Sequence, residues 1–375
     1  MLRTSGVSCL FGSFAVVALT AQAPAGPAPA DRWTQFRGTA ALTGRSEAQL
    51  PGTLKPIWTY EAGDAIESSA AIADGVVYVG SANGELHAVN LADGSLKWKY
   101  QASADGIGES SPAVSGGVVL VGDLAGVLHA VDAASGRPVW TFKTGTEIKS
   151  SPVVAGDRVL VGSYDSHLYA VGLKDGKLIW KAQTEGYVHA TPAVVDGIAY
   201  VAGCDEILRG IRISDGKEVF ATSSGSYTIA SPAIEGGRAY YGTYDNVVIS
   251  VDLKSGKTVW TYKHPDRSFP YYSSAALTPD RVIVGGRDRM IHAIDRKSGK
   301  GLWTFATRAR VDSSPVVAGG RVYVGGNDGL LYVLDAATGE RVFQFEAGGP
   351  LSASPAVAAG RLVIGSQDGR LFCLG

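Results

Sequence analysis

One segment of sequence recurs eight times along the chain at a spacing of about forty residues. A clear copy is Ser110-Ser111-Pro112-Ala113-Val114, in which a serine pair precedes a proline and two apolar residues. The first residue of the pair, or its substitute, falls at Ser68, Ser110, Ser150, Ala190, Ala230, Ser273, Ser313 and Ala353. Successive copies lie 42, 40, 40, 40, 43, 40 and 40 residues apart. So regular a period indicates one structural unit built eight times.

Each copy has the sequence pattern of four short β-strands. In the first copy we expect strand A at 68–72, B at 76–80, C at 86–90 and D at 96–100. Apolar residues alternate within these runs, and Asp-Gly or Asn-Gly turns separate them. No long apolar period of 3.6 residues appears after residue 25, so helix should be close to absent.

Four-stranded units at this period predict an all-β fold, an eight-bladed β-propeller of four-stranded antiparallel blades. An open solenoid is the rival, and the ends of the chain discriminate between the two. The eighth copy stops at Gly375 after its strand C, whereas an unmatched strand D at 56–61 precedes the first copy. Pairing these two segments closes the ring and removes the exposed edges. We expect a single propeller over 33–375, with an N-terminal segment at 33–55; a seven-bladed ring with a stray repeat is the remaining alternative.

The charge balance argues against a nucleic-acid partner. Lys plus Arg (34) nearly cancels Asp plus Glu (35), which leaves a net charge of −1 and no overall field that would attract a polyanion. The 3 cysteines are too few for a disulfide scaffold. They are also too far apart in the sequence for a zinc site.

The N-terminus has the pattern of a secretory signal. In residues 1–25, Arg3 precedes the apolar run 9–19, and small residues at 21–25 provide a cleavage site. The apolar run is too short to span a membrane, which takes roughly 20 residues. No cysteine lies just after the run, so we expect a periplasmic protein without a lipid anchor and without a transmembrane segment in its mature chain. Residues 26–32 are rich in proline and alanine, which predicts a linker.

An eleven-residue pattern joins strands C and D of most copies. Its first copy is Ala88-Val-Asn90-Leu-Ala-Asp-Gly94-Ser-Leu-Lys-Trp98, and later copies end at Trp140, Trp180, Trp260 and Trp303. We expect the glycine to permit a tight turn and the indole, placed on the small alanine, to fill the gap between blades.

This pattern resembles the tryptophan-docking repeat of the pyrroloquinoline-quinone (PQQ) propeller superfamily, from Trp58 to Gly375. The segment Trp33-Thr-Gln-Phe36-Arg37-Gly38 is also similar to the N-terminus of its compact, exported, BamB-like members. The resemblance implies either a quinoprotein dehydrogenase or a non-catalytic envelope protein. In the dehydrogenases, it implies a quinone held against two adjacent cysteines and calcium bound through long insertions.

The chain has no adjacent cysteines, and no copy is lengthened by more than three residues. We therefore expect no cofactor, and PQQ with calcium is disfavoured. The predicted function is an exported, non-catalytic module, expected to be a monomer, that binds a protein or another cell-envelope component. A PQQ-dependent or other cofactor-dependent oxidoreductase that uses the axial funnel is the alternative.

Ionisable residues precede the serine pair in six of the eight copies. They are Glu67, Glu109, Lys149, His189, Tyr272 and Asp312. In a propeller the start of strand A points toward the axis, so these side chains should meet at the mouth of the central channel. They either line a solvated opening or form a ligand site in an axial funnel.

The longest insertion, before the sixth copy, suggests a second part of the site. It contains Arg267, Tyr271 and Tyr272, and the next loop between strands D and A adds Arg308 and Arg310. Aromatic residues and arginine are enriched in binding hot spots, so we expect a solvent-facing partner patch here.

Three histidines occupy one position of strand C. They are His87, His129 and His292, and other copies have Tyr169, Tyr332 or Phe372 at this position. An aromatic residue in every one of these copies predicts packing between blades, and we expect no metal site.

Overall fold

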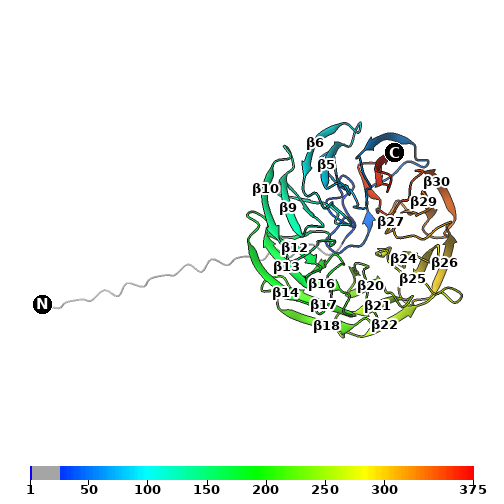
Figure 1. The fold of residues 1–375 in the computed structure, drawn as a ribbon. Coiled ribbons are helices and arrows are strands. Elements are labelled where there is room, and N and C mark those ends of the chain that lie inside the picture. Colours follow the sequence, from blue (N-terminus) through cyan, green and yellow to red (C-terminus); the bar gives the residue numbers. More distant parts are fainter. Residues whose placement is uncertain (2–25) are drawn as a thin grey trace.

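The chain forms a ring of eight antiparallel blades around a central axis (Figure 1). This computed structural model describes Met1 and residues 26–375, so residues 2–25 of the expected signal peptide lie outside the described part. The described residues contain strands, turns and loops but no helix. The predicted all-β, eight-bladed propeller is therefore confirmed.

Strands A to D of each blade run from the axis to the rim. Blades 1 to 4 consist of β3 (Ala71–Ala73), β4 (Val76–Gly80), β5 (Glu85–Asn90), β6 (Leu96–Gln101); β7 (Ala113–Ser115), β8 (Val118–Gly122), β9 (Val127–Asp132), β10 (Pro138–Lys143); β11 (Val153–Ala155), β12 (Arg158–Ser163), β13 (His167–Gly172), β14 (Leu178–Gln183); and β15 (Ala193–Val195), β16 (Ile198–Ala202), β17 (Ile207–Arg212), β18 (Glu218–Ser223).

Blades 5 to 8 repeat this order. They consist of β19 (Ala233–Glu235), β20 (Arg238–Gly242), β21 (Val248–Asp252), β22 (Thr258–Tyr262); β23 (Ala276–Leu277), β24 (Arg281–Gly286), β25 (Met290–Asp295), β26 (Gly301–Ala306); β27 (Val316–Ala318), β28 (Arg321–Gly325), β29 (Leu330–Asp335), β30 (Arg341–Glu346); and β31 (Ala356–Ala358), β32 (Arg361–Gly365), β33 (Arg370–Leu374), β2 (Pro56–Glu61).

The ring is closed in blade 8 by strands from the two ends of the chain. The N-terminal strand β2 pairs antiparallel with the C-terminal strand β33, in a register that places Pro56 opposite Leu374 and Glu61 opposite Arg370. In Figure 1 the blue strand and the red C-terminal strand lie side by side at the top of the ring. The predicted closure is confirmed.

A second closed ring, made of hydrogen bonds, encircles the axis. The second member of each serine pair is Ser or Thr in all eight blades. Its hydroxyl oxygen accepts a hydrogen bond from the backbone N–H of the equivalent residue in the preceding blade, at 2.9–3.1 Å. The last bond runs from Ser354 in blade 8 to Ser69 in blade 1. These bonds satisfy backbone donors that would otherwise be buried without a partner.

At the rim the tryptophans dock onto the next blade. Trp98 of blade 1 donates its indole N–H to the carbonyl oxygen of Ala133 in blade 2, at 3.0 Å. Its ring lies against Gly136, where a Cβ atom would come within 2.7 Å of the indole. Ala88 is the cross-strand partner of Trp98 within the same blade and belongs to the same core cluster, as the motif predicts, and the glycine of the next blade leaves further space for the ring.

The three strand-C histidines lie between blades, as predicted. Tyr60 in strand D of blade 8 contacts His87 in blade 1, with 3.0 Å between the hydroxyl oxygen and Nδ1. Tyr100 meets His129 and Tyr262 meets His292 in the same way. The packing role is confirmed.

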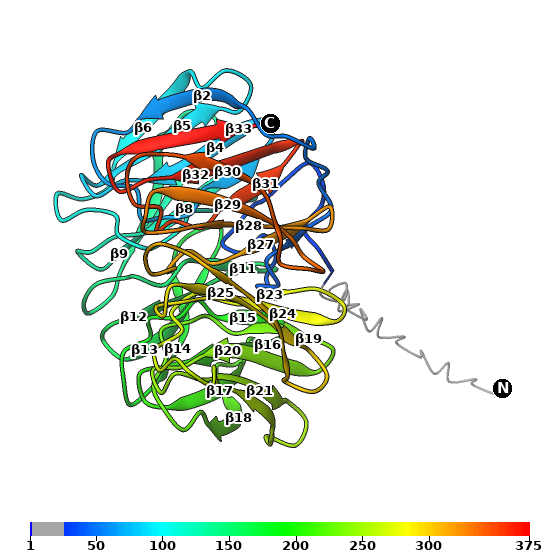
Figure 2. The same ribbon diagram turned by 90° about the vertical axis from the view of Figure 1, so that its right-hand side faces the viewer.

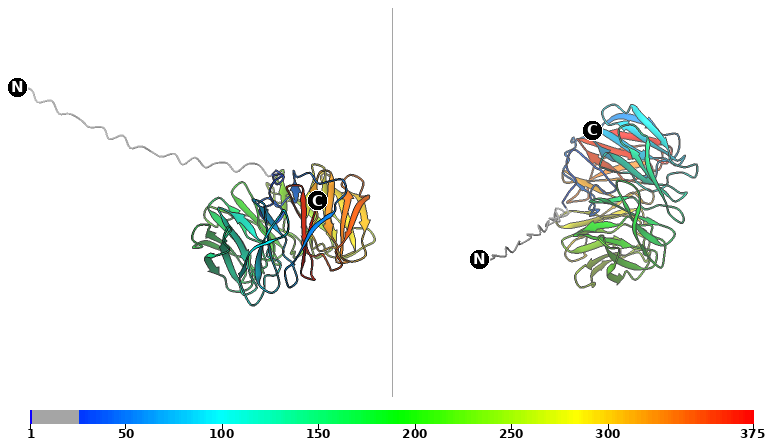
Figure 3. Two further views of the ribbon diagram at one scale, coloured as in Figure 1. Left: turned by 90° about the horizontal axis from the view of Figure 1, so that it is seen from above. Right: turned by 90° about the vertical axis from the view of Figure 1, so that its left-hand side faces the viewer.

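The N-terminal segment runs across one end of the central channel, on one face of the ring (Figures 2 and 3). It forms backbone hydrogen bonds with strand A of six blades, β3, β7, β15, β19, β23 and β27, and with Ala359, the residue that follows β31. Its two-residue strand β1 (Arg45–Ser46) pairs parallel with β27. The expected linker at 26–32 is partly attached as well, because Ala28 is buried and its N–H bonds to the carbonyl of Arg45.

We predict that the axial hydrogen-bond ring is important for stability. Ser314→Ala removes the acceptor for the buried N–H of Ser274, which should lower the free energy of unfolding by about 1–3 kcal/mol. Ser268→Ala, in an exposed loop, is the control and should change it by no more than about 0.5 kcal/mol. Denaturant unfolding measures both; equal effects would contradict the role of the ring.

A second prediction concerns pH. Burial lowers the pKa of His87 from 6.5 to about 4. Between these values the unfolded chain binds more protons at this site than the folded chain, so the free energy of unfolding falls as the pH falls through this window.

Blade 8 has phenylalanine at this position. The substitution His87→Phe should therefore reduce the loss of unfolding free energy between pH 7 and pH 4.5 by on the order of 2 kcal/mol. Denaturant unfolding of both proteins at the two pH values measures the difference. Parallel pH profiles would contradict the assignment.

Candidate functional site

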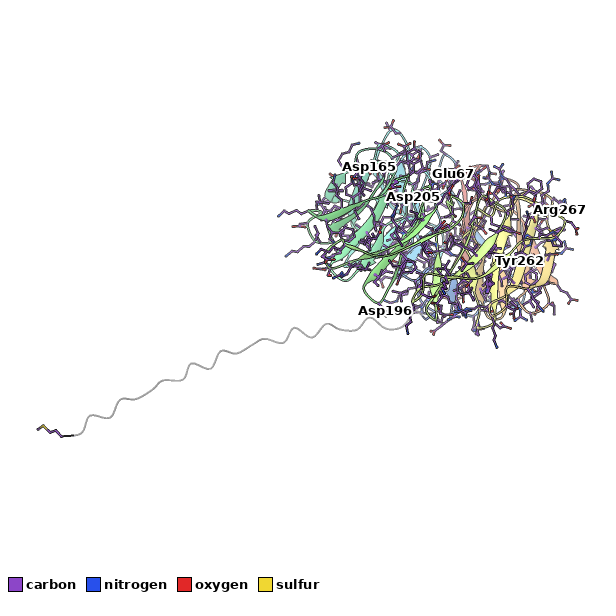
Figure 4. The ribbon with its side chains drawn as sticks, turned by 90° about the horizontal axis from the view of Figure 1, so that it is seen from below. Glu67, Asp165, Asp196, Asp205, Tyr262 and Arg267 are labelled. Carbon is purple, nitrogen blue, oxygen red and sulfur yellow. The ribbon has the colours of Figure 1, made fainter. Side chains whose placement is uncertain are left out.

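A hollow of about 260 Å³ opens on the axis, on the face formed by the D–A loops and the B–C turns. Figure 4 shows Glu67 on the same face as Asp165 and Asp205 of two B–C turns, with Asp196 of an A–B turn on the opposite face. We call this hollow the funnel. Phe36 of the N-terminal segment lies at it, together with hydroxyls of the axial ring.

Seven of the ten predicted site residues line the funnel. They are Glu67, Glu109, Lys149, His189, Tyr272, Arg310 and Asp312. Six of them immediately precede the serine pair, so the eightfold repeat itself brings side chains from different blades to one place.

The other three predicted residues lie elsewhere. Arg267 and Arg308 are exposed outside the funnel, and Figure 4 shows Arg267 at the outer edge of the molecule. Tyr271 is only 2% exposed, so the expectation that it faces solvent is wrong. Its side chain lies against Gly242, where other blades place Ile66, Ile148 or Val311 against the equivalent glycine.

A hydrogen-bonded chain crosses one wall of the funnel. Tyr164 Oη lies 2.7 Å from His189 Nδ1, and His189 Nε2 lies 2.9 Å from a carboxylate oxygen of Glu109. Burial raises the pKa of Tyr164, so this hydroxyl keeps its proton. The Nε2–H of His189 then donates to Glu109.

The two glutamates of the funnel differ in their surroundings. Burial opposes the ionisation of Glu109, but the hydrogen bond from His189 and the nearby charges outweigh it, so the pKa of Glu109 lies below its ordinary value. Burial and the charge of Glu109 raise the pKa of Glu67. Glu67 is therefore the carboxylate whose negative charge is less well compensated.

The opposite wall holds an ion-pair network centred on Asp312. Arg287 and Arg310 each place Nε 2.8 Å from one of its carboxylate oxygens. Asn327 donates its side-chain N–H to the same carboxylate at 3.3 Å. The guanidinium carbon of Arg287 also lies 3.4 Å from the ring centre of Tyr272, a cation–π contact.

Five tyrosines surround part of the funnel mouth. Tyr164 and Tyr187 stack in parallel, with ring centres 4.8 Å apart. Tyr227, Tyr244 and Tyr272 form a second group, with neighbouring ring centres 4.4 and 4.9 Å apart. Tyr187 and Tyr227 are 54% and 44% exposed, so flat aromatic surface faces solvent beside the charged hollow.

Comparison with known proteins places the chain in a family. The family model described as outer membrane protein assembly factor BamB matches residues 48–125, 124–266, 189–286 and 272–374. The chain belongs to the BamB family. A search of curated protein sequences finds no match.

Solved structures similar to this BamB-family chain include a BamB and two dehydrogenases. BamB from Moraxella catarrhalis has a TM-score of 0.73 and 21% identity, covering 86% of this chain and 97% of that one. A europium-containing methanol dehydrogenase has a TM-score of 0.76 and 14% identity, covering 92% of this chain and 98% of that one. Quinohemoprotein alcohol dehydrogenase from Comamonas testosteroni has a TM-score of 0.80 and 15% identity, covering 92% of this chain and 80% of that one. These likenesses establish the fold alone.

The residues of this BamB-family chain do not fit a calcium-quinone site of the kind that the resemblance implies. Among the described residues, no group of three His, Cys, Asp or Glu side chains is arranged to hold a metal ion. Cys204 lies in the B–C turn of blade 4 and Cys373 in β33 of blade 8, so neither provides an adjacent pair.

The sequence analysis missed the residues that the B–C turns contribute. Four of these residues lie two positions after the first glycine at the end of strand B: Tyr164, Tyr244, Arg287 and Gln367. The equivalent positions of the other blades hold Ala82, Leu124, Cys204 and Asn327. The repeat alignment was a sufficient signal, because side chains at equivalent positions of a propeller point in equivalent directions.

We predict opposite outcomes for two adjacent tyrosines. Tyr271→Ala removes a buried ring from the core between blades and should cost about 3–5 kcal/mol of unfolding free energy. Tyr272→Ala removes a half-buried funnel residue and should cost far less, about 1 kcal/mol. Denaturant unfolding compares them, and similar losses would contradict the register described here.

Proposed function

We propose that this BamB-family chain is an exported, non-catalytic module of the cell envelope that holds a protein partner on its funnel face. The observation that carries the proposal is the exposed tyrosine surface around a charged hollow. Tyrosine and arginine are enriched in binding hot spots, because they combine large rigid area with polar groups. Both kinds of side chain occur together on this face.

The tyrosines are held in place before any partner arrives. Tyr187 is supported by the parallel ring of Tyr164, and Tyr227 by Tyr244. Tyr164 is in turn fixed by its hydrogen bond with His189. Pre-organised side chains lose little conformational entropy on binding, which favours affinity.

The proposed location follows from the family and from the N-terminal pattern. The name of the matching family refers to outer membrane protein assembly. Residues 1–25 have the pattern of a secretory signal. Among the described residues, no helix has the length and apolar character needed to cross a membrane. We propose a periplasmic monomer without a lipid anchor or a resident cofactor.

The alternative is a quinone-dependent oxidoreductase. It rests on an analogy of fold with two of the similar structures, which are dehydrogenases. The separated cysteines and the donor set of the funnel favour the binding module over this alternative. Reconstitution with PQQ and calcium, followed by dye reduction with alcohols and sugars, tests it. Robust turnover would overturn the non-catalytic proposal.

We predict that the exposed tyrosines are required for partner capture. The double variant Tyr187→Ala with Tyr227→Ala should lose the proteins that are crosslinked to the wild type in the envelope, while its melting temperature stays nearly unchanged. The control is Phe269→Ala, which removes a ring of similar exposure from the outer loop.

Crosslinking in cells followed by mass spectrometry gives the measurement. Capture of the same proteins by the double variant, or an equal loss in the Phe269→Ala control, would refute the proposal.

A further inference from the structure

Glu67 is a half-buried carboxylate in the funnel that has no direct ionic partner. Among the described residues, no side chain forms a hydrogen bond or ion pair with it. Burial and the charge of Glu109 raise the pKa of Glu67, and the more distant charge of Lys149 offsets only part of this. Burying a charged group without a partner costs free energy, so a ligand that neutralises this charge is favoured.

The cations of the funnel are already engaged. Arg287 and Arg310 share Asp312, and His189 donates to Glu109. Lys149 lies with its ammonium nitrogen 5.4 Å from the ring centre of Tyr164 and forms no ion pair with Glu67 or Glu109, although its charge lowers the pKa of both. The negative charge that remains available to a ligand is therefore concentrated on the wall formed by blades 1 and 2.

The surroundings of this wall suit an organic cation. Tyrosine rings lie nearby at the mouth, and their faces attract cations. Phe36 offers an apolar contact for the aliphatic part of a long side chain. A hollow of about 260 Å³ has room for one side chain rather than a folded segment.

We propose that the funnel receives a single arginine or lysine side chain from a protruding loop of the protein partner, with its charge paired to Glu67. This inference rests on the proposed protein-binding function and adds the chemistry of the partner. A backbone loop of the partner would lie on the tyrosine surface while its cationic side chain enters the axis. On the wall formed by blades 1 and 2, an anionic ligand would meet the like charges of Glu67 and Glu109, which disfavours it there.

The test uses two blocked peptides that differ in one charge. Acetyl-Gly-Gly-Arg-Gly-Gly-amide carries a guanidinium group, and its twin with citrulline carries a neutral urea group of nearly the same shape. Isothermal titration of the mature wild-type protein at pH 7 and low salt should show saturable binding of the arginine peptide. We expect the citrulline peptide to bind at least about tenfold more weakly.

A matched pair of variants locates the binding. Glu67→Gln keeps the shape of the side chain but removes its charge, and should weaken the binding of the arginine peptide by about tenfold or more. Glu61→Gln removes a glutamate from the exposed rim strand β2 and should leave binding unchanged. The comparison of peptides on the wild type does not depend on how either variant folds.

Three results would overturn the inference: no saturable binding of the arginine peptide, equal binding of both peptides, or unchanged binding by Glu67→Gln. The crosslinking experiment with Tyr187→Ala and Tyr227→Ala is independent of these peptides. If the tyrosines prove necessary for capture while the arginine peptide fails, the protein-binding function stands and only the cationic side chain is refuted.

Discussion

The closed ring of hydroxyl-to-backbone hydrogen bonds around the axis is the interaction on which the rest of the structure depends. Strand A is only two or three residues long in each blade, so it can form few bonds within its own sheet. Each blade instead binds the next through a Ser or Thr side chain, and the bond from Ser354 to Ser69 completes the circle. Because every blade is both donor and acceptor, the ring has no free end.

The rim of the propeller is held by a different contact. Six tryptophans donate their indole N–H to a carbonyl of the next blade at 2.8–3.2 Å. The turn glycine below each indole leaves room for the ring, as at Gly136. Hydrogen bonds at the axis and indole docking at the rim together fix the angle between blades. The N-terminal segment then covers one end of the channel, which leaves the other end open as the funnel.

This scaffold leaves the loops of the open face free to vary. The same position carries Glu67, Lys149, His189 or Asp312 in different blades without affecting the ring below it. The resulting funnel is asymmetric: a carboxylate wall on blades 1 and 2, tyrosines at the mouth, and an ion-pair network around Asp312. The function that we propose rests on this asymmetry rather than on the fold.

The sequence by itself determined the period, the blade count and the seam, because regular spacing and alternating apolar residues depend on local chain geometry. It also determined that residues before the serine pair meet at the axis. Tertiary structure alone decided which neighbours these side chains have. Tyr271 and Tyr272 are adjacent in sequence, yet one lies on Gly242 in the core and the other contacts Arg287 in the funnel. Arg287 pairs with Asp312 across 25 positions of sequence, and such contacts depend on the packing of whole blades, which no local pattern encodes.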